Sequence, residues 1–234
     1  MNQQIEQAKE RFGQLLQEQM LRVERMKAQK EFVDYQMKEQ IVIGVAGGDG
    51  IGPAITAQAK RIMEFLLKDA VEKGKVTFKM INDLTIEKRA EAMKAIPDHV
   101  VEELKQCDVI LKGPTTTPRE GDPWPNIESA NVAMRKELDL FANVRPVKVP
   151  EKGIDWVFYR ENTEGAYTLG SKGFAVNEDI SIDFTVATQD GTERIIRAAF
   201  EYAHKNGKTK VTAVTKANII KATDGKFLDI FYTI

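Results

Sequence analysis

Residues 41–67 read IVIGVAGGDGIGPAITAQAKRIMEFLL, and this stretch decides the fold class. The apolar run at 41–46 is typical of a strand that is buried in a parallel sheet. A glycine-rich loop follows at 47–52, and Pro53 then begins a helix that is expected over residues 54–67. A strand, a glycine loop and a helix in this order predict the start of an α/β domain.

The rest of the chain continues the alternation of strands and helices. Four prolines between residues 114 and 125 mark an extended loop in the middle of the chain. No internal repeat or low-complexity segment is found. The pattern predicts helices at 97–106, 129–138 and 192–206, strands at 76–81, 108–112, 141–147, 155–159 and 211–215, and an exposed strand at 180–188.

Residues 1–40 are expected to form a long amphipathic helix. The segment contains no proline, and its apolar residues recur at steps of three and four, as Phe12, Leu15 and Leu16 do. One interpretation is a helix that packs on its own protein or on a dimer partner. The alternative is an interaction module for a different partner.

Composition excludes several classes of function. The chain has 34 basic and 35 acidic residues among 234, so a net charge of -1 gives no reason to expect nucleic acid or an anionic membrane as partner. No apolar stretch approaches the length of a transmembrane helix. Cys107 is the only cysteine and is expected to be a small half-buried residue. A chain that cannot form an intrachain disulfide is expected in the cytoplasm.

Three arginines and a tyrosine between residues 129 and 167 suggest a site for a small polycarboxylate. Arg145 and Arg160 stand beside apolar residues of expected strands, and a buried guanidinium needs a carboxylate partner. Arg135 lies in the expected helix at 129–138, and Tyr167 follows Arg160 closely. The alternative is that each arginine pairs with a nearby acid of the chain itself, among them Glu137, Asp139 and Glu161.

Two loops and one helix start carry further candidate chemistry. The glycines at 47–52 could cradle phosphate, although the spacing differs from the dinucleotide fingerprint and a tight structural turn explains it as well. The segment 112–118 places three threonines after a strand, where open α/β sheets bind ligands. Ser129 could act only as an N-cap, whereas Asn131 and Arg135, four residues apart, share one face of the helix.

The longest of these segments, Arg160-Glu-Asn-Thr-Glu-Gly-Ala-Tyr167, resembles the isocitrate and isopropylmalate dehydrogenase family of β-decarboxylating dehydrogenases. The segments 47–53, 112–118 and 216–221 resemble family motifs in the same order. The resemblance runs from residue 41 to about residue 229. It implies the isopropylmalate dehydrogenase-like α/β fold, which is not a Rossmann fold. A parallel or mixed sheet with flanking helices is expected.

The same resemblance implies a domain plan. Residues 1–40 would be an additional amphipathic helix. Residues 41–140 would form the first half of the large nucleotide-binding domain, and residues 141–234 the small substrate and dimerisation domain. Family members continue well beyond the equivalent of Ile234, so the chain is expected to be a fragment or truncated product of a functional enzyme. The stretch 119–128 is longer than its family counterpart.

Roles for individual residues follow from the resemblance alone. Tyr167 and Lys216 are the implied catalytic acid–base pair, with Lys216 reaching in from the second subunit of a homodimer; the alternative for Lys216 is an ordinary surface lysine. The implied substrate-binding residues are Ser129, Asn131, Arg135, Arg145 and Arg160. The implied contacts to the cofactor, NAD or NADP, are Ile51, Lys112, Thr116, Thr117 and Asn218. A divalent Mg or Mn ion is implied, but none of its aspartate ligands is expected in this chain.

Ser129 and Asn131 favour isocitrate as the substrate implied by the resemblance, because isopropylmalate enzymes have apolar residues at these positions. The expected reaction is oxidation of isocitrate followed by β-decarboxylation to 2-oxoglutarate. Homoisocitrate and 3-isopropylmalate are the alternative substrates. A non-catalytic regulatory subunit or pseudoenzyme that keeps the carboxylate site is a further alternative.

Overall fold

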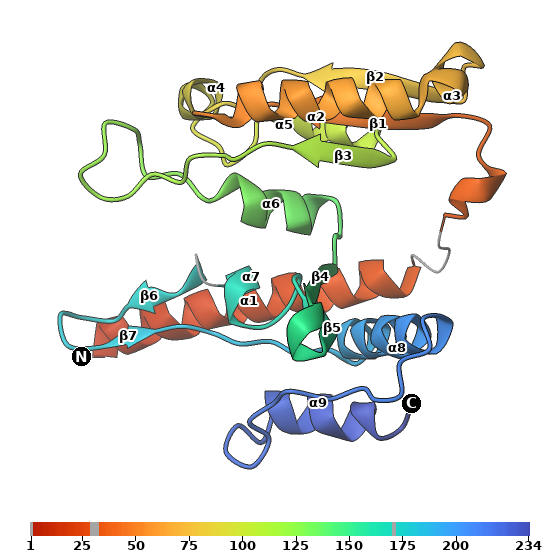
Figure 1. Cartoon of the computed structure of the whole chain (residues 1–234). Coiled ribbons are helices and arrows are strands. Elements are labelled where there is room, and N and C mark those ends of the chain that lie inside the picture. Colours follow the sequence, from red (N-terminus) through yellow and green to blue (C-terminus); the bar gives the residue numbers. More distant parts are fainter. Residues whose placement is uncertain (1, 29–32, 170–171) are drawn as a thin grey trace. The chain divides into compact units, whose positions relative to one another are not determined.

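The computed structural model describes residues 2–28, 33–169 and 172–234, and the chain divides into two compact units (Figure 1). Residues Phe32–Asp139 form one unit, named here the sheet unit. Residues Met1–Glu31 and Leu140–Ile234 together form the other, named the hairpin unit. The mixed α/β class expected from the sequence is confirmed.

The sheet unit contains a parallel three-stranded sheet in the order β2-β1-β3. The central strand β1 pairs on both sides, with Ile43 opposite Phe78 on one neighbour and opposite Val109 on the other. Its last four residues are buried. This burial fits the continuous apolar run that predicted the strand. The strands are β1 (Ile41–Ala46), β2 (Val76–Ile81) and β3 (Val109–Lys112).

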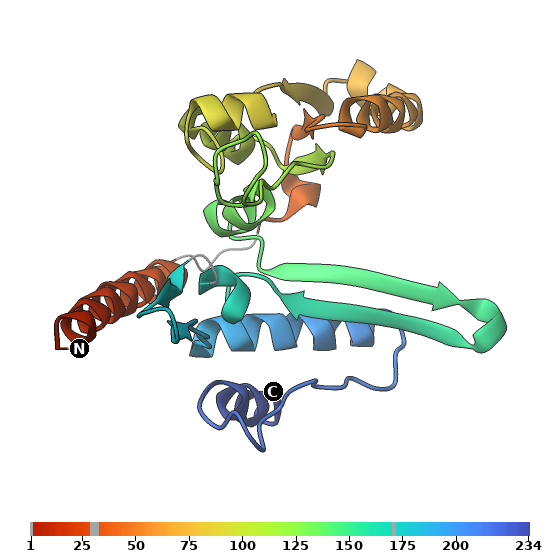
Figure 2. The same cartoon turned by 90° about the vertical axis from the view of Figure 1, so that its left-hand side faces the viewer.

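Helices cover both faces of this sheet (Figure 2). Successive residues of β1 point to opposite faces, so Val45 packs with Met63 of α2 and Ala46 lies in a cluster with Leu104 of α5 and Met134 of α6. The two clusters form the core of the unit. Its helices are α2 (Gly52–Leu66), α3 (Lys68–Glu72), α4 (Ile86–Glu91), α5 (Asp98–Lys105) and α6 (Ala130–Glu137).

The hairpin unit is built on β4 (Ala142–Val149) and β5 (Ile154–Glu161), an antiparallel pair. The turn between them is a 3-10 helix, Pro150–Lys152, which ends at Gly153 with a φ of 64°. Helix α8 (Gln189–Lys205) packs on one face of the hairpin, where Ile195 and Ile196 meet Tyr159. The short helix α9 (Thr223–Phe231) completes this apolar cluster through Ile230.

The N-terminal helix α1 (Asn2–Ala28) also belongs to the hairpin unit. The sequence predicted an amphipathic helix here, and Leu15 is buried against the rest of the chain. The helix is shorter than the predicted 1–40, because a 3-10 turn at Tyr35–Met37, capped by Asp34, stands in place of its last part. Helix α7 (Ala166–Leu169) and the two-residue strands β6 (Phe174–Ala175) and β7 (Ser181–Ile182) complete the unit.

Two predicted strands differ from the structure. Residues 211–215 form no strand and belong to none of the described sheets. A strand needs a neighbour that pairs with its backbone groups. The strand predicted at 180–188 is reduced to Ser181–Ile182, which pairs only with β6. In both segments the apolar alternation is present in the sequence, but the partner strand that it requires is missing or short.

Cys107 is half-buried, as expected, and its thiol donates a hydrogen bond to the carbonyl of Glu103 at 3.4 Å. Burial raises the pKa of the Cys107 thiol above its usual value. A side chain at Gly44 would approach the Cys107 sulfur to 2.7 Å, so the thiol fills space beside the central strand. Among the described helices, none combines the length and apolar character required to cross a bilayer.

Candidate functional site

The glycine loop after β1 lies directly against the loop after β3. A Cβ atom on Gly48 would stand 2.0 Å from the carbonyl oxygen of Pro114, and one on Gly113 would stand 2.0 Å from the carbonyl oxygen of Gly47. Gly48 also has a φ of 69°, which favours glycine. The glycines therefore allow two backbone segments to touch at the carboxyl ends of neighbouring strands, where open α/β sheets bind ligands.

Asp49 connects these two loops to a third segment. Its carboxylate accepts hydrogen bonds from the backbone N–H of Ile86 at 2.7 Å and of Thr116 at 2.6 Å. Its own N–H donates to the carbonyl oxygen of Pro114 at 2.8 Å. The sequence analysis missed this role, although an acid between glycines at a strand end was a signal that could have revealed it. Asp49 fixes the backbone of Thr116, one of the predicted cofactor contacts.

Arg89 holds the same region from inside the unit. Its side chain is fully buried and donates to three backbone carbonyls, those of Ala95 at 2.7 Å, Thr116 at 2.7 Å and Glu128 at 3.1 Å. Burial lowers the pKa of Arg89 and the nearby Asp49 opposes that shift. A guanidinium stays charged at neutral pH. Arg89 therefore holds both ends of the 116–128 loop with one charged group.

Lys112 lies at the end of β3 and is half-buried. Its ammonium group donates to the carbonyl oxygen of Gly113 at 2.7 Å and to the hydroxyl of Thr115 at 3.1 Å. Burial lowers the pKa of Lys112, and the positive charges of Arg89 and Arg135 act in the same direction. The negative charge of Asp49 opposes this shift, so Lys112 lies near charges of both signs.

The other predicted cofactor contacts of the sheet unit are accessible. Ile51 is 69% exposed, at the residue before α2. Thr117 is exposed and Thr116 is half-buried. The structure therefore brings the loops that carry Ile51, Lys112, Thr116 and Thr117 to one edge of the sheet.

Helix α6 presents the three residues predicted to recognise the substrate's distinguishing group. Ser129 occupies the N-cap position, but its side chain makes no capping hydrogen bond. The interpretation of Ser129 as a mere N-cap therefore receives no support. Asn131 is exposed and Arg135 is half-buried one turn later. The basic side chains of the last turn, Arg135 and Lys136, interact favourably with the negative end of the helix dipole.

The predicted burial of Arg145 is wrong. Arg145 is exposed on β4, and its Nε donates to Asn143 at 2.8 Å. A two-stranded hairpin that packs on a helix through one face leaves its other face exposed, so apolar neighbours did not imply burial here. Asn143 is opposite Arg160 of β5, which places Arg145, Asn143 and Arg160 on the same face of the hairpin. Arg160 is half-buried.

The segment between Arg160 and Tyr167 is held by hydrogen bonds to the carboxylates of Glu161 and Glu164. The carboxylate of Glu161 accepts from the N–H groups of Thr163 and Glu164 and from the Thr163 hydroxyl at 2.6 Å. Burial raises the pKa of Glu161, and these hydrogen bonds oppose the shift. Tyr167 lies in α7, but its side chain is outside the described residues.

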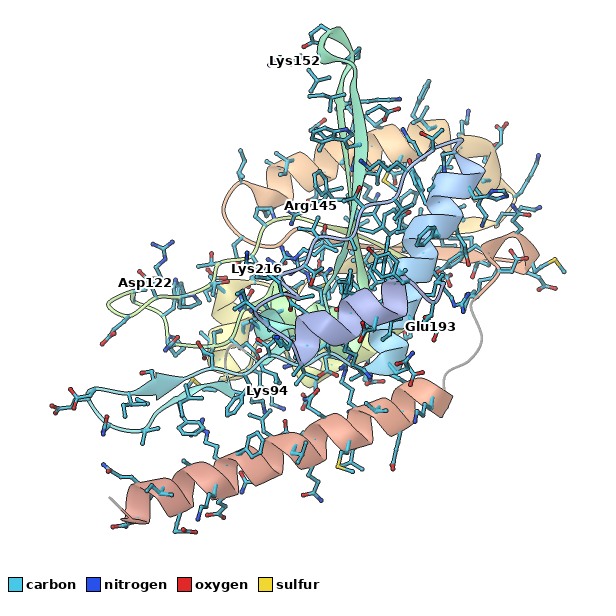
Figure 3. The ribbon with its side chains drawn as sticks, turned by 90° about the horizontal axis from the view of Figure 1, so that it is seen from below. Lys94, Asp122, Arg145, Lys152, Glu193 and Lys216 are labelled. Carbon is cyan, nitrogen blue, oxygen red and sulfur yellow. The ribbon has the colours of Figure 1, made fainter. Side chains whose placement is uncertain are left out.

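Lys216 and Asn218 lie in the segment before α9, and both side chains are exposed. Lys216 is labelled in Figure 3. The carboxylate of Asp224 accepts from the N–H of Lys216 at 2.7 Å, and the carbonyl of Lys216 accepts from the N–H groups of Ile219 and Ile220. Asp224 therefore fixes the turn that carries both residues. This role of Asp224 was not predicted from the sequence.

The candidate residues divide between the two units. The sheet unit holds Ile51, Lys112, Thr116, Thr117, Ser129, Asn131 and Arg135, and the hairpin unit holds Arg145, Arg160, Tyr167, Lys216 and Asn218. Among the described side chains, no group of three His, Cys, Asp or Glu residues could hold a metal ion. These residues do not by themselves fit the Mg or Mn ion implied by the resemblance.

The chain is similar in sequence to several curated proteins. The chain is 35% identical to a homoisocitrate dehydrogenase of Methanocaldococcus jannaschii over 206 residues, 81% of this chain and 56% of that protein. It is 38% identical to regulatory subunit 3 of mitochondrial NAD isocitrate dehydrogenase from Arabidopsis thaliana over 188 residues, 78% of this chain and 46% of that protein. The chain spans about half the length of the curated relatives it matches.

Solved structures and a family model agree with these relatives. The structure is similar to the crystal structure of isocitrate dehydrogenase from Methylococcus capsulatus, with a TM-score of 0.67, 33% identity, and coverage of 83% of this chain and 57% of that one. A family model described as isocitrate/isopropylmalate dehydrogenase matches residues 42–234. Helix α1 lies outside the matched residues. The chain therefore belongs to the isocitrate/isopropylmalate dehydrogenase family.

Proposed function

We propose that this chain is part of an NAD- or NADP-dependent enzyme that oxidises and decarboxylates isocitrate to 2-oxoglutarate. The observation that carries the substrate assignment is the start of α6, where the hydroxyl of Ser129 makes no cap and Asn131 is exposed. Polar groups at these positions suit a carboxylate of the substrate. An isopropyl group would leave them without partners, which is unfavourable.

The arginines are proposed to bind the substrate's carboxylates. Arg135 and Arg160 are half-buried and Arg145 is exposed, so guanidinium groups from α6 and from the hairpin are available for paired hydrogen bonds to carboxylates. Binding of this kind would hold C2 of isocitrate in position for hydride transfer to the nicotinamide ring. The exposure of Arg145 supports a role in ligand binding over one in an internal ion pair.

Lys216 and Tyr167 are the proposed proton-transfer residues. Lys216 would accept the proton of the 2-hydroxyl while the hydride leaves C2 for the cofactor. Loss of carbon dioxide from the β-carboxylate would leave the electrons of the broken C–C bond in an enolate, and Tyr167 would donate a proton to its carbon. Ile51, Lys112, Thr116, Thr117 and Asn218 are the proposed contacts to NAD or NADP. The divalent Mg or Mn ion of this proposal would need ligands beyond the described side chains.

A cytoplasmic homodimer is proposed as the form in which the enzyme acts. The single cysteine supports a reducing compartment. Family membership supports the dimer, in which Lys216 would serve the partner's site. Light scattering of the 234-residue chain measures this directly, and a monomer at all concentrations would refute the dimer.

Two alternatives each have a specific observation in their favour. A regulatory subunit is suggested by the 38% identity to the Arabidopsis thaliana regulatory subunit, and homoisocitrate oxidation by the 35% identity to the Methanocaldococcus jannaschii enzyme. Both Tyr167 and Lys216 are present with their surrounding motifs, which favours a catalytic role over a regulatory one.

The proposal is tested by isothermal titration of the chain with isocitrate, homoisocitrate and 3-isopropylmalate, followed by measurement of NAD(P)H formation. Isocitrate is expected to bind most tightly. The substitution Arg135→Gln should weaken its binding at least about tenfold, because a charge-assisted pair contributes more than 1.4 kcal/mol. Arg119→Gln removes the same charge from an exposed position and should leave the affinity unchanged.

The outcomes separate the candidate functions. Equal affinity of the original chain and the Arg135→Gln variant would refute the proposed site, and tighter binding of another acid would replace the substrate. Isocitrate binding without NAD(P)H formation in the presence of NAD or NADP would support the regulatory alternative.

A further inference from the structure

The N-terminal helix α1 packs on the β6–β7 segment, which follows the loop between Arg160 and Tyr167. This loop is named here the candidate catalytic loop. The Phe12 ring stacks on the Phe184 ring at 5.7 Å, and the Arg11 guanidinium lies over the Phe174 ring at 5.4 Å. Leu15, on the same side of α1, is 6% exposed. Figure 3 shows α1 running alongside the β6–β7 segment. Helix α1 is thus bound to its own chain by apolar and cation–π contacts, although the family model begins only at residue 42.

Arg22 of α1 reaches the loop itself. Its Nη1 lies 3.1 Å from Oε1 of Glu164, and its Nη2 donates to the hydroxyl of Thr163 at 3.1 Å. The side chains of Arg22 and Glu164 are only 16% and 5% exposed. An ion pair at this depth is little screened by water. The Glu164 carboxylate also accepts hydrogen bonds from the N–H and the hydroxyl of Thr188.

Thr163 is the point at which the loop is held. Its hydroxyl donates to Glu161 at 2.6 Å and accepts from Arg22 and, at 2.7 Å, from Arg194 of α8. One donor and two acceptor positions are all that a hydroxyl offers, so the bonding capacity of Thr163 is filled. Arg22 also pairs with Glu164, and the Arg194 guanidinium lies 3.6 Å from the Glu161 carboxylate. Loss of Arg22 would therefore remove one of the two guanidinium groups that contact the Thr163 hydroxyl.

We propose that Arg22 is a positioning residue: it holds Thr163 and Glu164 so that the loop keeps Arg160 and the backbone of Tyr167 at a fixed separation. Arg160 lies three residues before Thr163, and Tyr167 lies three residues after Glu164. This inference rests on the proposed function for its consequence in binding, but the order of the loop is a property of the chain alone.

The test compares Arg22→Gln, Arg22→Lys and Arg25→Gln in the full 234-residue chain. Arg25 is exposed one turn further along the same helix, so its substitution removes the same charge without touching the loop. Backbone amide exchange over residues 161–169 measures loop order, and titration with isocitrate well below the unfolding transition measures binding. Arg22→Gln should raise the exchange rate and weaken binding about tenfold. Arg22→Lys should recover part of both, because lysine restores the charge but cannot contact Thr163 and Glu164 together.

Amide exchange and isocitrate titration separate a failure of this inference from a failure of the proposed function. If Arg22→Gln and Arg25→Gln show the same exchange rates, Arg22 does not position the loop and the inference is overturned. A lower thermal midpoint for Arg22→Gln with unchanged exchange and affinity would also overturn it, because that is the result of a purely structural contact. If the unaltered chain does not bind isocitrate, the proposed function fails, while the exchange measurement still decides the role of Arg22.

Discussion

Replacing Arg89 with methionine should be among the most destabilising single changes in the sheet unit. The side chain is 0% exposed and donates three hydrogen bonds to backbone carbonyls. A hydrogen bond from a charged group contributes about 1.5–3 kcal/mol, but the removed guanidinium also no longer has to be desolvated. Methionine fills the space of the stem and leaves three buried carbonyls without donors. We expect the free energy of unfolding to fall by about 4 kcal/mol.

Urea unfolding followed by circular dichroism measures this loss. Arg89→Lys should lose about half as much, because an ammonium group can reach some of the carbonyls but lacks the planar fork. Arg61→Met is the control: Arg61 is exposed on α2, and its substitution should change the free energy by less than about 0.5 kcal/mol. A loss below about 1 kcal/mol for Arg89→Met, with an unchanged denaturant slope, would show that the three carbonyls find other donors and would refute the reasoning.

Two further predictions concern the same unit. Gly48→Ala should lower the free energy of unfolding by at least about 2 kcal/mol, and Gly50→Ala by only about 1 kcal/mol. Both glycines have a positive φ, but only at Gly48 would an added Cβ atom lie 2.0 Å from a carbonyl oxygen. Equal losses in urea unfolding would contradict this prediction. The pKa of Asp108 is held below its usual value by hydrogen bonds from Lys38, the larger cause, and from the N–H of Val42. Its carboxylate therefore stabilises the fold above about pH 4, and this contribution is lost as the pH falls through the folded-state pKa. Asp108→Asn should lower stability at neutral pH and flatten its decline below pH 4; an unchanged acid profile would count against the assignment.

The sheet was predictable because its signals are local. A continuous apolar run followed by glycines and a helix specifies a buried parallel strand wherever it occurs, and β1 is found at the predicted residues. The segment 211–215 has the same apolar character without becoming a strand. Strand formation needs hydrogen bonds from a neighbour, and the pattern of one segment carries no information about whether a neighbour is present. The sequence can therefore indicate candidate strands, but a strand forms only where a neighbouring strand pairs with it.

The residues that hold the candidate loops could not be predicted in the same way. Arg89 lies in the polar sequence of α4, Ile-Glu-Lys-Arg-Ala-Glu, which gives no sign of burial. Its partners are backbone carbonyls of residues 95, 116 and 128, and a carbonyl is the same group whatever the residue type. Arg145 shows the opposite error, since apolar neighbours predicted burial and the hairpin exposes it. The resemblance to family motifs located both candidate loops, although it indicated neither the burial of Arg89 nor the exposure of Arg145.

One physical arrangement recurs in the two units and explains this difference. In each, guanidinium groups that are buried or half-buried hold a loop, Arg89 at Thr116 and Arg22 with Arg194 at Thr163. Two of the side chains proposed to meet ligands, Ile51 and Arg145, are exposed. A holding arginine must satisfy several buried acceptors at once, so its loss disorders a loop, whereas an exposed arginine is held by little and is free to bind an anion. Substitutions of the first kind should therefore change loop order and affinity together, and substitutions of the second kind should change affinity alone.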